Sequence, residues 1–166
     1  MLKEVGPLGS HGLVTISMDD GLPLALEKME KEGIRHLPVV DGTGRVIGIL
    51  SDRDLKRAMR PDPHLNENGN RPRFSKAARI ADYMSWPAQG VDEHTPVGDV
   101  VRVMLQDRIS SLLILVGPSA NPVGIVTTDD LLRFLLKLLD EPGQKSRLVP
   151  VREFFDQLRF PDSVLI

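Results

Sequence analysis

The apolar positions of the chain follow two alternating periods. Between Leu22 and Met29 they recur at i, i+3, i+4 and i+7, the spacing of one face of an amphipathic helix. Two short apolar runs, 37–40 and 46–50, follow on either side of Asp41-Gly42-Thr43-Gly44. Short apolar runs separated by a glycine-containing turn are typical of a β-hairpin. The pattern predicts a helix followed by two antiparallel strands.

The same pattern occurs a second time further along the chain. Gly48–Leu55 matches Gly124–Leu131 at an offset of 76 residues, and Ile34–Val40 matches Ile109–Leu115 at an offset of 75. The difference of one residue lies in the turn after Asp41. Each copy reads as strand, helix, strand, strand, helix, so the repeat predicts a mixed α/β fold made of two similar units.

The segments outside the repeat differ from it in composition. Prolines, glycines and asparagines between the copies indicate a linker. Gly6–Ser10 resembles the remnant of a cleaved expression tag and lacks the short helix that precedes the second copy. The predicted organisation is a flexible N-terminus 1–12, a first unit 13–59, a linker 60–78, a second unit 79–139 and a tail 140–166.

The composition excludes several classes of protein. The chain has 166 residues, no cysteine and a formal net charge of -2. A disulfide framework, a thiolate metal site and a cysteine nucleophile are therefore excluded, and the charge argues against a general nucleic-acid binder. The apolar run Leu131–Leu139 is too short to span a bilayer. We expect a cytoplasmic protein with no nucleic-acid or membrane partner.

Five segments of the sequence carry a resemblance to a known family: Ile34–Asp41, Gly48–Leu55, Ile80–Ser85, His94–Val97 and Gly124–Leu131. In their order and spacing they are similar to a tandem pair of cystathionine-β-synthase (CBS) domains, called a Bateman module, of the stand-alone prokaryotic type. The resemblance implies two pseudo-symmetric βαββα units packed sheet to sheet, with adenosyl ligands (AMP, ADP, ATP or S-adenosylmethionine) bound in two clefts between them.

A hydroxyl and a carboxylate three residues apart end the last strand of each copy. These are Ser51 with Asp54 and Thr127 with Asp130. A carboxylate can accept hydrogen bonds from both ribose hydroxyls, and the hydroxyl side chain can donate to a phosphate at the start of a helix. The alternative is a helix N-cap pair, for which the same residue types are preferred. The resemblance favours the nucleotide site, although one pair can serve both purposes.

The two copies differ in charge next to these pairs. Arg35, His36 and Arg53 give the first copy a basic character, and we assign all three to the cleft of Asp54. The second copy has serines at 110–111 and an additional carboxylate at Asp129. The Asp54 cleft should therefore favour a phosphorylated ligand, and the Asp130 cleft should be weaker, empty or suited to a less anionic one. The alternative is that both arginines are solvated surface groups.

The resemblance also implies which residues hold the adenine. In the family, backbone and apolar groups of the opposite unit enclose the base. Alignment gives Ala88, Gln89 and Ile109 for the Asp54 cleft. For the Asp130 cleft it gives Val14 and Ile34. The alternative for apolar residues at strand positions is ordinary core packing.

Motifs of catalysis and metal binding are missing. The four histidines have no ligand spacing, and the glycines of 42–48 do not fit a dinucleotide-binding loop. We expect no enzyme, no metal and no required cofactor, but a regulatory sensor of an adenosyl ligand, acting on an unknown partner protein. The alternative is a structural dimerisation module with degenerate nucleotide sites.

Two apolar segments near the C-terminus suggest interfaces. The helix around Leu131–Leu139 has seven apolar residues out of nine, which predicts burial on more than one side and hence a homodimer. Phe154, Phe155 and Leu158 predict a short amphipathic helix in the tail. Packing of this helix on its own chain is favoured over docking of a partner.

Overall fold

The computed structural model describes residues 4–59, 74 and 78–139. The chain divides into a compact unit, Met1–Phe134, and a second unit, Leu135–Ile166, of which the last turns of helix α4 are described. The predicted linker and tail therefore lie mostly outside the described residues. The described elements are, in order, η1 (Gly6–Leu8), β1 (Ser10–His11), β2 (Ile16–Ser17), α1 (Leu22–Glu32), β3 (His36–Val40), β4 (Val46–Ser51), α2 (Asp52–Ala58), η2 (Ile80–Asp82), β5 (Gly90–Asp92), α3 (Val97–Asp107), β6 (Ser111–Val116), β7 (Asn121–Thr127) and α4 (Thr128–Leu139).

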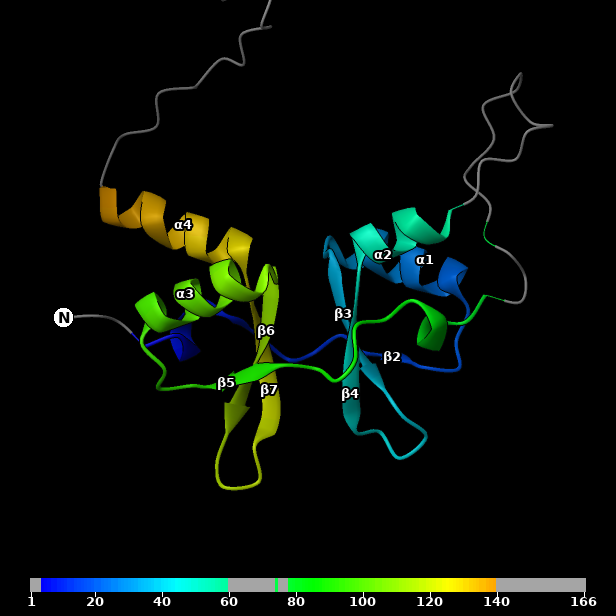
Figure 1. Ribbon diagram of the computed structural model, residues 1–166, viewed down its shortest axis with the longest axis horizontal. Helices are drawn as coiled ribbons and strands as arrows, with labels where there is room; N and C mark the ends of the chain where they lie inside the picture. Colours follow the sequence, from blue (N-terminus) through cyan, green and yellow to red (C-terminus); the bar gives the residue numbers. More distant parts are fainter. Residues whose placement is uncertain (1–3, 60–73, 75–77, 140–166) are drawn as a thin grey trace, which may run out of the picture. The chain divides into compact units, whose positions relative to one another are not determined.

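The strands form two mixed sheets within the first unit. One has the order β2-β3-β4 and the other β1-β7-β6-β5. In each sheet a hairpin pairs antiparallel, β3 with β4 and β6 with β7, and a short strand from before the helix pairs parallel with the first hairpin strand. Figure 1 shows the two hairpins next to each other. The predicted mixed α/β fold with two repeated units is confirmed.

The chain crosses from one sheet to the other at two equivalent places. Residues 10–11 pair with β7 of the second sheet, and the chain then enters β2 of the first. Seventy-five residues later, Ser85 pairs with Ile49 of β4 in the first sheet, and the chain then enters β5 of the second. The two crossing segments, which we define as 10–14 and 85–89, therefore join the two halves of the fold, one built around each sheet, by backbone hydrogen bonds.

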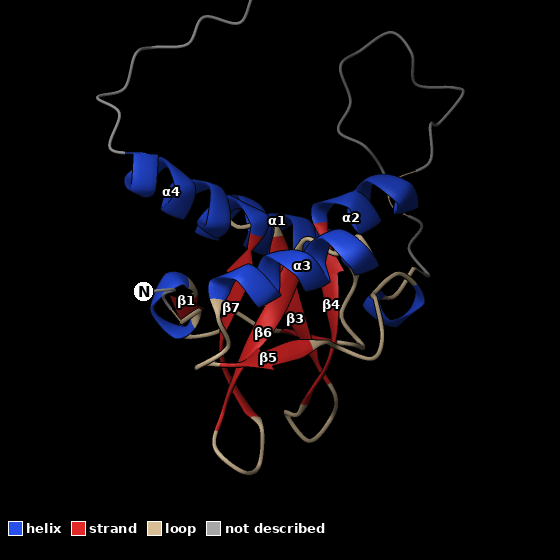
Figure 2. Cartoon of the chain, turned by 60° about the vertical axis from the view of Figure 1, so that its left-hand side comes forward, coloured by secondary structure: helices blue, strands red, loops and turns tan. Residues whose placement is uncertain are grey.

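The residues before each crossing pack into the core of the other half. Val5, which has no exposed surface, belongs to a cluster with Val100 and Met104 of α3. Ile80, also fully buried, belongs to a cluster with Leu22 of α1. Helix η1, which precedes the first copy of the repeat, thus packs on the second half. Helix η2, which begins the second copy, packs on the first half. Figure 2 shows η1 and β1 beside β7.

The N-terminal segment differs from the prediction of a flexible stretch without a short helix. Residues 6–8 form η1, and the N–H groups of Val5 and Gly6 donate to the carbonyls of Thr95 and Glu93, at 3.0 and 2.9 Å. Gly9 packs against Ile114 so closely that a Cβ has no space. The sequence of Gly6–Ser10, which resembles a tag remnant, is an integral part of the fold. The sequence did not predict η1, because the glycines of this segment give no apolar pattern.

Two equivalent glycines allow the crossing segments to approach the sheets. A Cβ on Gly48 of β4 would lie 2.8 Å from Met84 Sδ and 2.9 Å from the Ser85 carbonyl oxygen. A Cβ on Gly124 of β7 would lie 2.6 Å from the Ser10 carbonyl oxygen. These separations are below van der Waals contact, so any side chain at either position forces the backbones apart. This explains why each copy of the repeat carries glycine at the same place.

We predict that Gly48→Ala and Gly124→Ala each lower the free energy of unfolding by about 1–3 kcal/mol, because overpacking displaces backbone. Gly42→Ala is the matched control, since a Cβ there meets nothing within 4 Å. Urea unfolding followed by circular dichroism measures all three variants. Equal stability of the three would contradict the role of the crossings.

Candidate ligand-binding clefts

The junction between β4 and α2 holds Asp54 in a fixed position. The Ser51 N–H and hydroxyl both donate to Asp54 Oδ2, at 2.9 and 2.6 Å, and the Asp54 N–H donates to Ser51 Oγ at 3.4 Å. This reciprocal arrangement is a capping box. The other oxygen, Oδ1, accepts from Arg57 at 3.0 Å. Asp54 is only 8% exposed, so its carboxylate is oriented before any ligand arrives.

The junction between β7 and α4 repeats this geometry. The Thr127 N–H and hydroxyl donate to Asp130 Oδ2 at 2.9 and 2.7 Å, and the Asp130 N–H donates to Thr127 Oγ1 at 3.4 Å. Arg133 lies 3.5 Å from Asp130 Oδ1. The capping interpretation is therefore confirmed at both junctions. Among the residues that the structure describes, one exposed arginine is the only hydrogen-bond partner of Oδ1 in each carboxylate. A ligand hydroxyl can share this oxygen or replace the arginine.

Each junction opens on a cavity between the halves. The Asp54 cavity has a volume of about 400 Å³, within the range of about 300–1,000 Å³ usual for small-molecule sites. Besides Asp54 it is lined by His36, Ile49, Ser51, Arg53, Arg57, Ser85, Trp86, Pro87, Ala88, Gln89, Arg108, Ile109, Ser110 and Ser111. The crossing segment 85–89 forms one wall.

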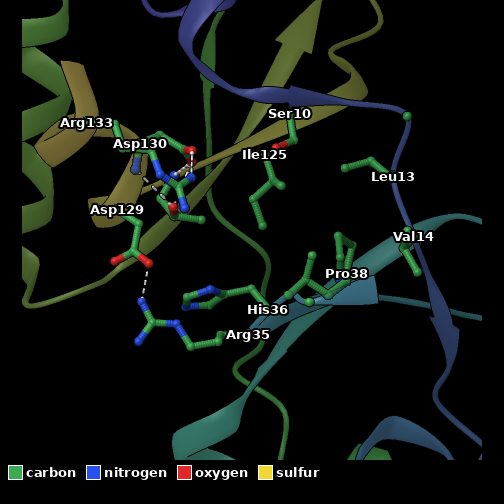
Figure 3. Close-up of a pocket in the computed structure, with 14 residues that line it drawn as sticks. Ser10, Leu13, Val14, Arg35, His36, Pro38, Ile125, Asp129, Asp130 and Arg133 are labelled. Carbon is green, nitrogen blue, oxygen red and sulfur yellow. Dashed lines mark hydrogen bonds and ion pairs between the residues drawn. The ribbon is translucent and has the colours of Figure 1, made fainter. Parts of the chain in front are cut away.

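The Asp130 cavity is smaller, at about 150 Å³. The other crossing segment supplies part of its wall (Figure 3). Besides Asp130 it is lined by Ser10, Gly12, Leu13, Val14, Gly33, Ile34, Arg35, His36, Pro38, Ile125, Thr127, Asp129 and Arg133. Each cavity thus takes its aspartate from one copy of the repeat and its crossing segment from the other.

The structure brings most of the predicted site residues to the cleft assigned to them. Around Asp54 these are Ser51, Arg53, His36, Ala88, Gln89 and Ile109. Around Asp130 they are Thr127, Val14 and Ile34. Whether they bind a ligand remains a prediction.

Arg35 lies on the other side from its predicted cleft. It lines the Asp130 cavity and forms an ion pair with Asp129 across the two halves (Figure 3). Its neighbour His36, the first residue of β3, lines both cavities. Arg35 precedes β3, and its side chain reaches Asp129 of the other half. Its place next to His36 in the sequence therefore does not bring it to the Asp54 cavity, which His36 also lines.

Among the charged and aromatic residues that line the Asp54 cavity, three were not predicted. Arg57 lies one helical turn after Asp54, and the i, i+3 spacing on one helix face was a usable signal. Trp86 is 71% exposed at the cavity, in the crossing segment, and no pattern marked it. Arg108 is equivalent to Gly33 and, like it, ends a helix in the left-handed region, with φ 54°. That conformation is uncommon for a residue with a side chain.

The charges of the two clefts differ more than the sequence indicated. Three arginines (53, 57 and 108) face one aspartate in the first cleft, whereas Arg35 and Arg133 face Asp129 and Asp130 in the second. Within the described residues no ion pair involves Arg53 or Arg108, while Arg35 is paired with Asp129. The Asp54 cleft therefore carries an excess of positive charge, and the Asp130 cleft is balanced internally.

His36 joins the halves between the cavities. Its Nε2 lies 2.9 Å from Ser110 Oγ, which belongs to the other half. Burial lowers the pKa of His36 below its ordinary value; Arg35 and Arg53 add to this effect, and Asp52 and Asp129 oppose it. At neutral pH the imidazole is therefore neutral and contributes a hydrogen bond rather than a charge.

Clusters of metal-ligating side chains and long apolar helices are absent from the described part of the chain. There, no group of three or more histidine, aspartate or glutamate side chains is placed to hold a metal ion. None of the helices described is both long and apolar enough to cross a membrane. The polar side chains that line the clefts are arginines, aspartates, serine and threonine hydroxyls, the Gln89 amide and one neutral histidine.

Comparison with known proteins identifies the fold. The CBS domain profile matches residues 3–61 and 80–137, the two halves together with their crossings. The chain is a tandem pair of CBS domains. A CBS domain-containing protein of Dictyostelium discoideum is 33% identical over 138 residues, which cover 82% of this chain and 93% of that protein.

Two similar solved structures contain ligands. A CBS domain pair in complex with 5′-methylthioadenosine and S-adenosyl-L-methionine is 25% identical and has a TM-score of 0.67; the match covers 83% of this chain and 99% of that one. The cytosolic domain of the Mg²⁺ channel MgtE in complex with ATP is 26% identical and has a TM-score of 0.57; the match covers 79% of this chain and 48% of that one. Both of these similar proteins were thus solved with adenosyl compounds.

We predict that His36 makes stability depend on pH on the acidic side of neutrality. Its folded pKa is lower than the unfolded value of about 6.5, so its contribution is complete above that value and is lost as pH falls through the folded pKa. His36→Gln should therefore lose less stability between pH 7 and pH 5 than the wild type. Urea unfolding across that range gives the difference.

His94→Gln is the control, because Glu4 raises the pKa of His94. The contribution of His94 is complete below about 6.5 and is lost as pH rises through the folded pKa, the opposite sign. A pH slope in His36→Gln equal to that of the wild type would contradict the assignment to His36.

Proposed function

We propose that this CBS pair is a non-catalytic regulatory module that binds an adenosyl ligand between its halves, with the Asp54 cleft as the main site. The observation that carries the proposal is the oriented carboxylate of Asp54 beside three arginines in a cavity of about 400 Å³. A ribose and an attached anionic group require this combination of an acceptor and adjacent positive charge.

The charge of the Asp54 cleft favours a phosphorylated adenosyl ligand such as AMP, ADP or ATP over S-adenosylmethionine. Asp54 would accept from the ribose hydroxyls, and Arg53 and Arg108 would contact the phosphate. The Ser51 hydroxyl would turn from Asp54 Oδ2 to donate to the phosphate as well. Ala88 and Ile109, from the opposite sheet and its crossing, would enclose the adenine. Arg57 would release Oδ1 of Asp54 or share it with the ribose, since its own side chain is exposed.

Regulation would follow from the position of the ligand between the halves. A ligand that contacts both β4 and the segment before β6 favours the relative packing in which both sets of contacts form. A partner protein sensitive to that packing would respond to the nucleotide.

The alternative function is a structural dimerisation module whose clefts no longer bind nucleotide. The small, internally neutralised Asp130 cavity is the observation that favours it. Arg53 and Arg108, which form no ion pair with any residue that the structure describes, argue against it for the Asp54 cavity, because a structural cleft gains nothing from uncompensated charges.

We predict that the chain binds AMP and that Asp54→Ala weakens binding at least about tenfold, the effect of losing hydrogen bonds to a charged group. Isothermal titration calorimetry measures the affinity, and circular dichroism shows that the variant is folded. ADP, ATP, S-adenosylmethionine and NAD titrated in parallel identify the preferred ligand.

Asp130→Ala is the matched control, because it removes the same capping bonds at the other junction. It should leave AMP affinity within about twofold of the wild type. Loss of binding in Asp130→Ala and not in Asp54→Ala would reverse the ranking of the clefts. The structural alternative predicts that none of the five ligands binds the wild type.

We also propose that the module forms a homodimer through α4. Five of its leucines are between 48% and 67% exposed, and none of its residues is buried in the single chain. Light scattering after size exclusion should give the mass of a dimer, and Leu132→Glu with Leu136→Glu should give a monomer. A wild-type monomer at micromolar concentration would contradict the proposal.

A further inference from the structure

The Arg35–Asp129 ion pair distinguishes the Asp130 cleft from its counterpart. Asp129 occupies the position that Arg53 occupies in the first copy, directly before the aspartate that both copies of the repeat carry. Its carboxylate accepts from Arg35 of the other half, at the edge of the cavity (Figure 3). An acidic side chain of the protein thus already holds the cation that an anionic ligand would need.

A phosphate in this cleft would meet unfavourable charges on two sides. Arg35 is engaged by Asp129, and Arg133 lies beside Asp130. The phosphate would have to break the Arg35–Asp129 pair and would leave the Asp129 carboxylate next to its own negative charge. In the Asp54 cleft neither cost arises, because the equivalent residue is Arg53 and Arg108 is unpaired within the described residues.

An uncharged nucleoside avoids both costs. The cavity of about 150 Å³ must widen for any nucleoside, but a ligand without phosphate leaves the charges of the cleft balanced. Oδ1 of Asp130 is positioned for a ribose hydroxyl in the same way as Oδ1 of Asp54. Val14, Ile34 and Ile125 supply apolar surface.

We propose that the Asp130 cleft takes an adenine nucleoside without a 5′-phosphate, and that Asp129 determines this specificity by holding Arg35. The inference rests on the proposed function, that the clefts bind adenosyl ligands, and adds that the two clefts select opposite charge states. The chain would then respond to two classes of adenosyl compound at once.

The test compares adenosine with AMP, which differ only in the phosphate. Calorimetry is done in an Asp54→Ala background, so that the second cleft dominates, with Asp54→Asn as the substitute background if the alanine variant does not fold. Adenosine should bind at least about tenfold more tightly than AMP. Adding Asp129→Arg, the residue type of the first copy, should shift the ratio of the two affinities toward AMP by about 100-fold.

Glu27→Arg is the control for net charge, since Glu27 is exposed on α1 and lines neither cavity. It should leave the ratio unchanged. AMP binding as tight as adenosine in the background, a shift in Asp129→Arg no larger than in Glu27→Arg, or no binding of adenosine would each overturn the inference. AMP binding to the wild type that is lost in Asp54→Ala shows separately that the proposed function stands; its absence would remove the proposed function as well.

Discussion

The exchange of backbone between the two sheets is the constraint on which the rest of the structure depends. Segments 10–14 and 85–89 each begin with a residue that is hydrogen-bonded to one sheet, and each leads into a strand of the other sheet. Gly48 and Gly124 permit that approach, because a Cβ on either residue would lie too close to a carbonyl oxygen of the crossing segment. Since each crossing also forms a wall of one cavity, the same contacts that join the halves create both clefts.

Within this symmetric frame the chemistry is asymmetric. The capping bonds orient Asp54 and Asp130 identically, so the acceptor for a ribose is a property of the repeat. The neighbouring charges belong to individual positions: Arg53 against Asp129, and Arg108 against Gly33. A few side chains on an unchanged backbone are therefore sufficient to give the two clefts different electrostatic character. His36, neutral and bonded to Ser110, lies between them.

The repeat was readable in the sequence because apolar spacing, turns and the hydroxyl–carboxylate pairs recur at a constant offset. Helix α1, both hairpins and the residues around Asp54 followed from that pattern. The N-terminal segment did not, because Gly6–Ser10 has no periodicity and its helix is stabilised by the second half, through Val5 and the Glu93 and Thr95 carbonyls. Tertiary contacts of this kind leave no local signal.

The site residues show the same division. Ser51, Asp54, Thr127 and Asp130 were predictable since they cap helices next to them in sequence. Arg35 was assigned to the wrong cleft because its partner, Asp129, is 94 residues away in the sequence. Arg108 was not predicted for the Asp54 cleft because it lies in the other copy of the repeat. Which half supplies the charged side chains of each cleft depends on how the chain crosses between the sheets. The structure was needed to establish these crossings.

The most direct test of the account is a crystal structure of the protein grown with excess AMP. The account predicts AMP in the Asp54 cleft, its ribose hydroxyls on the Asp54 carboxylate and its phosphate among Ser51, Arg53 and Arg108, with the Arg35–Asp129 pair intact. AMP bound instead at Asp130 with that pair broken, or both clefts without nucleotide, would contradict it.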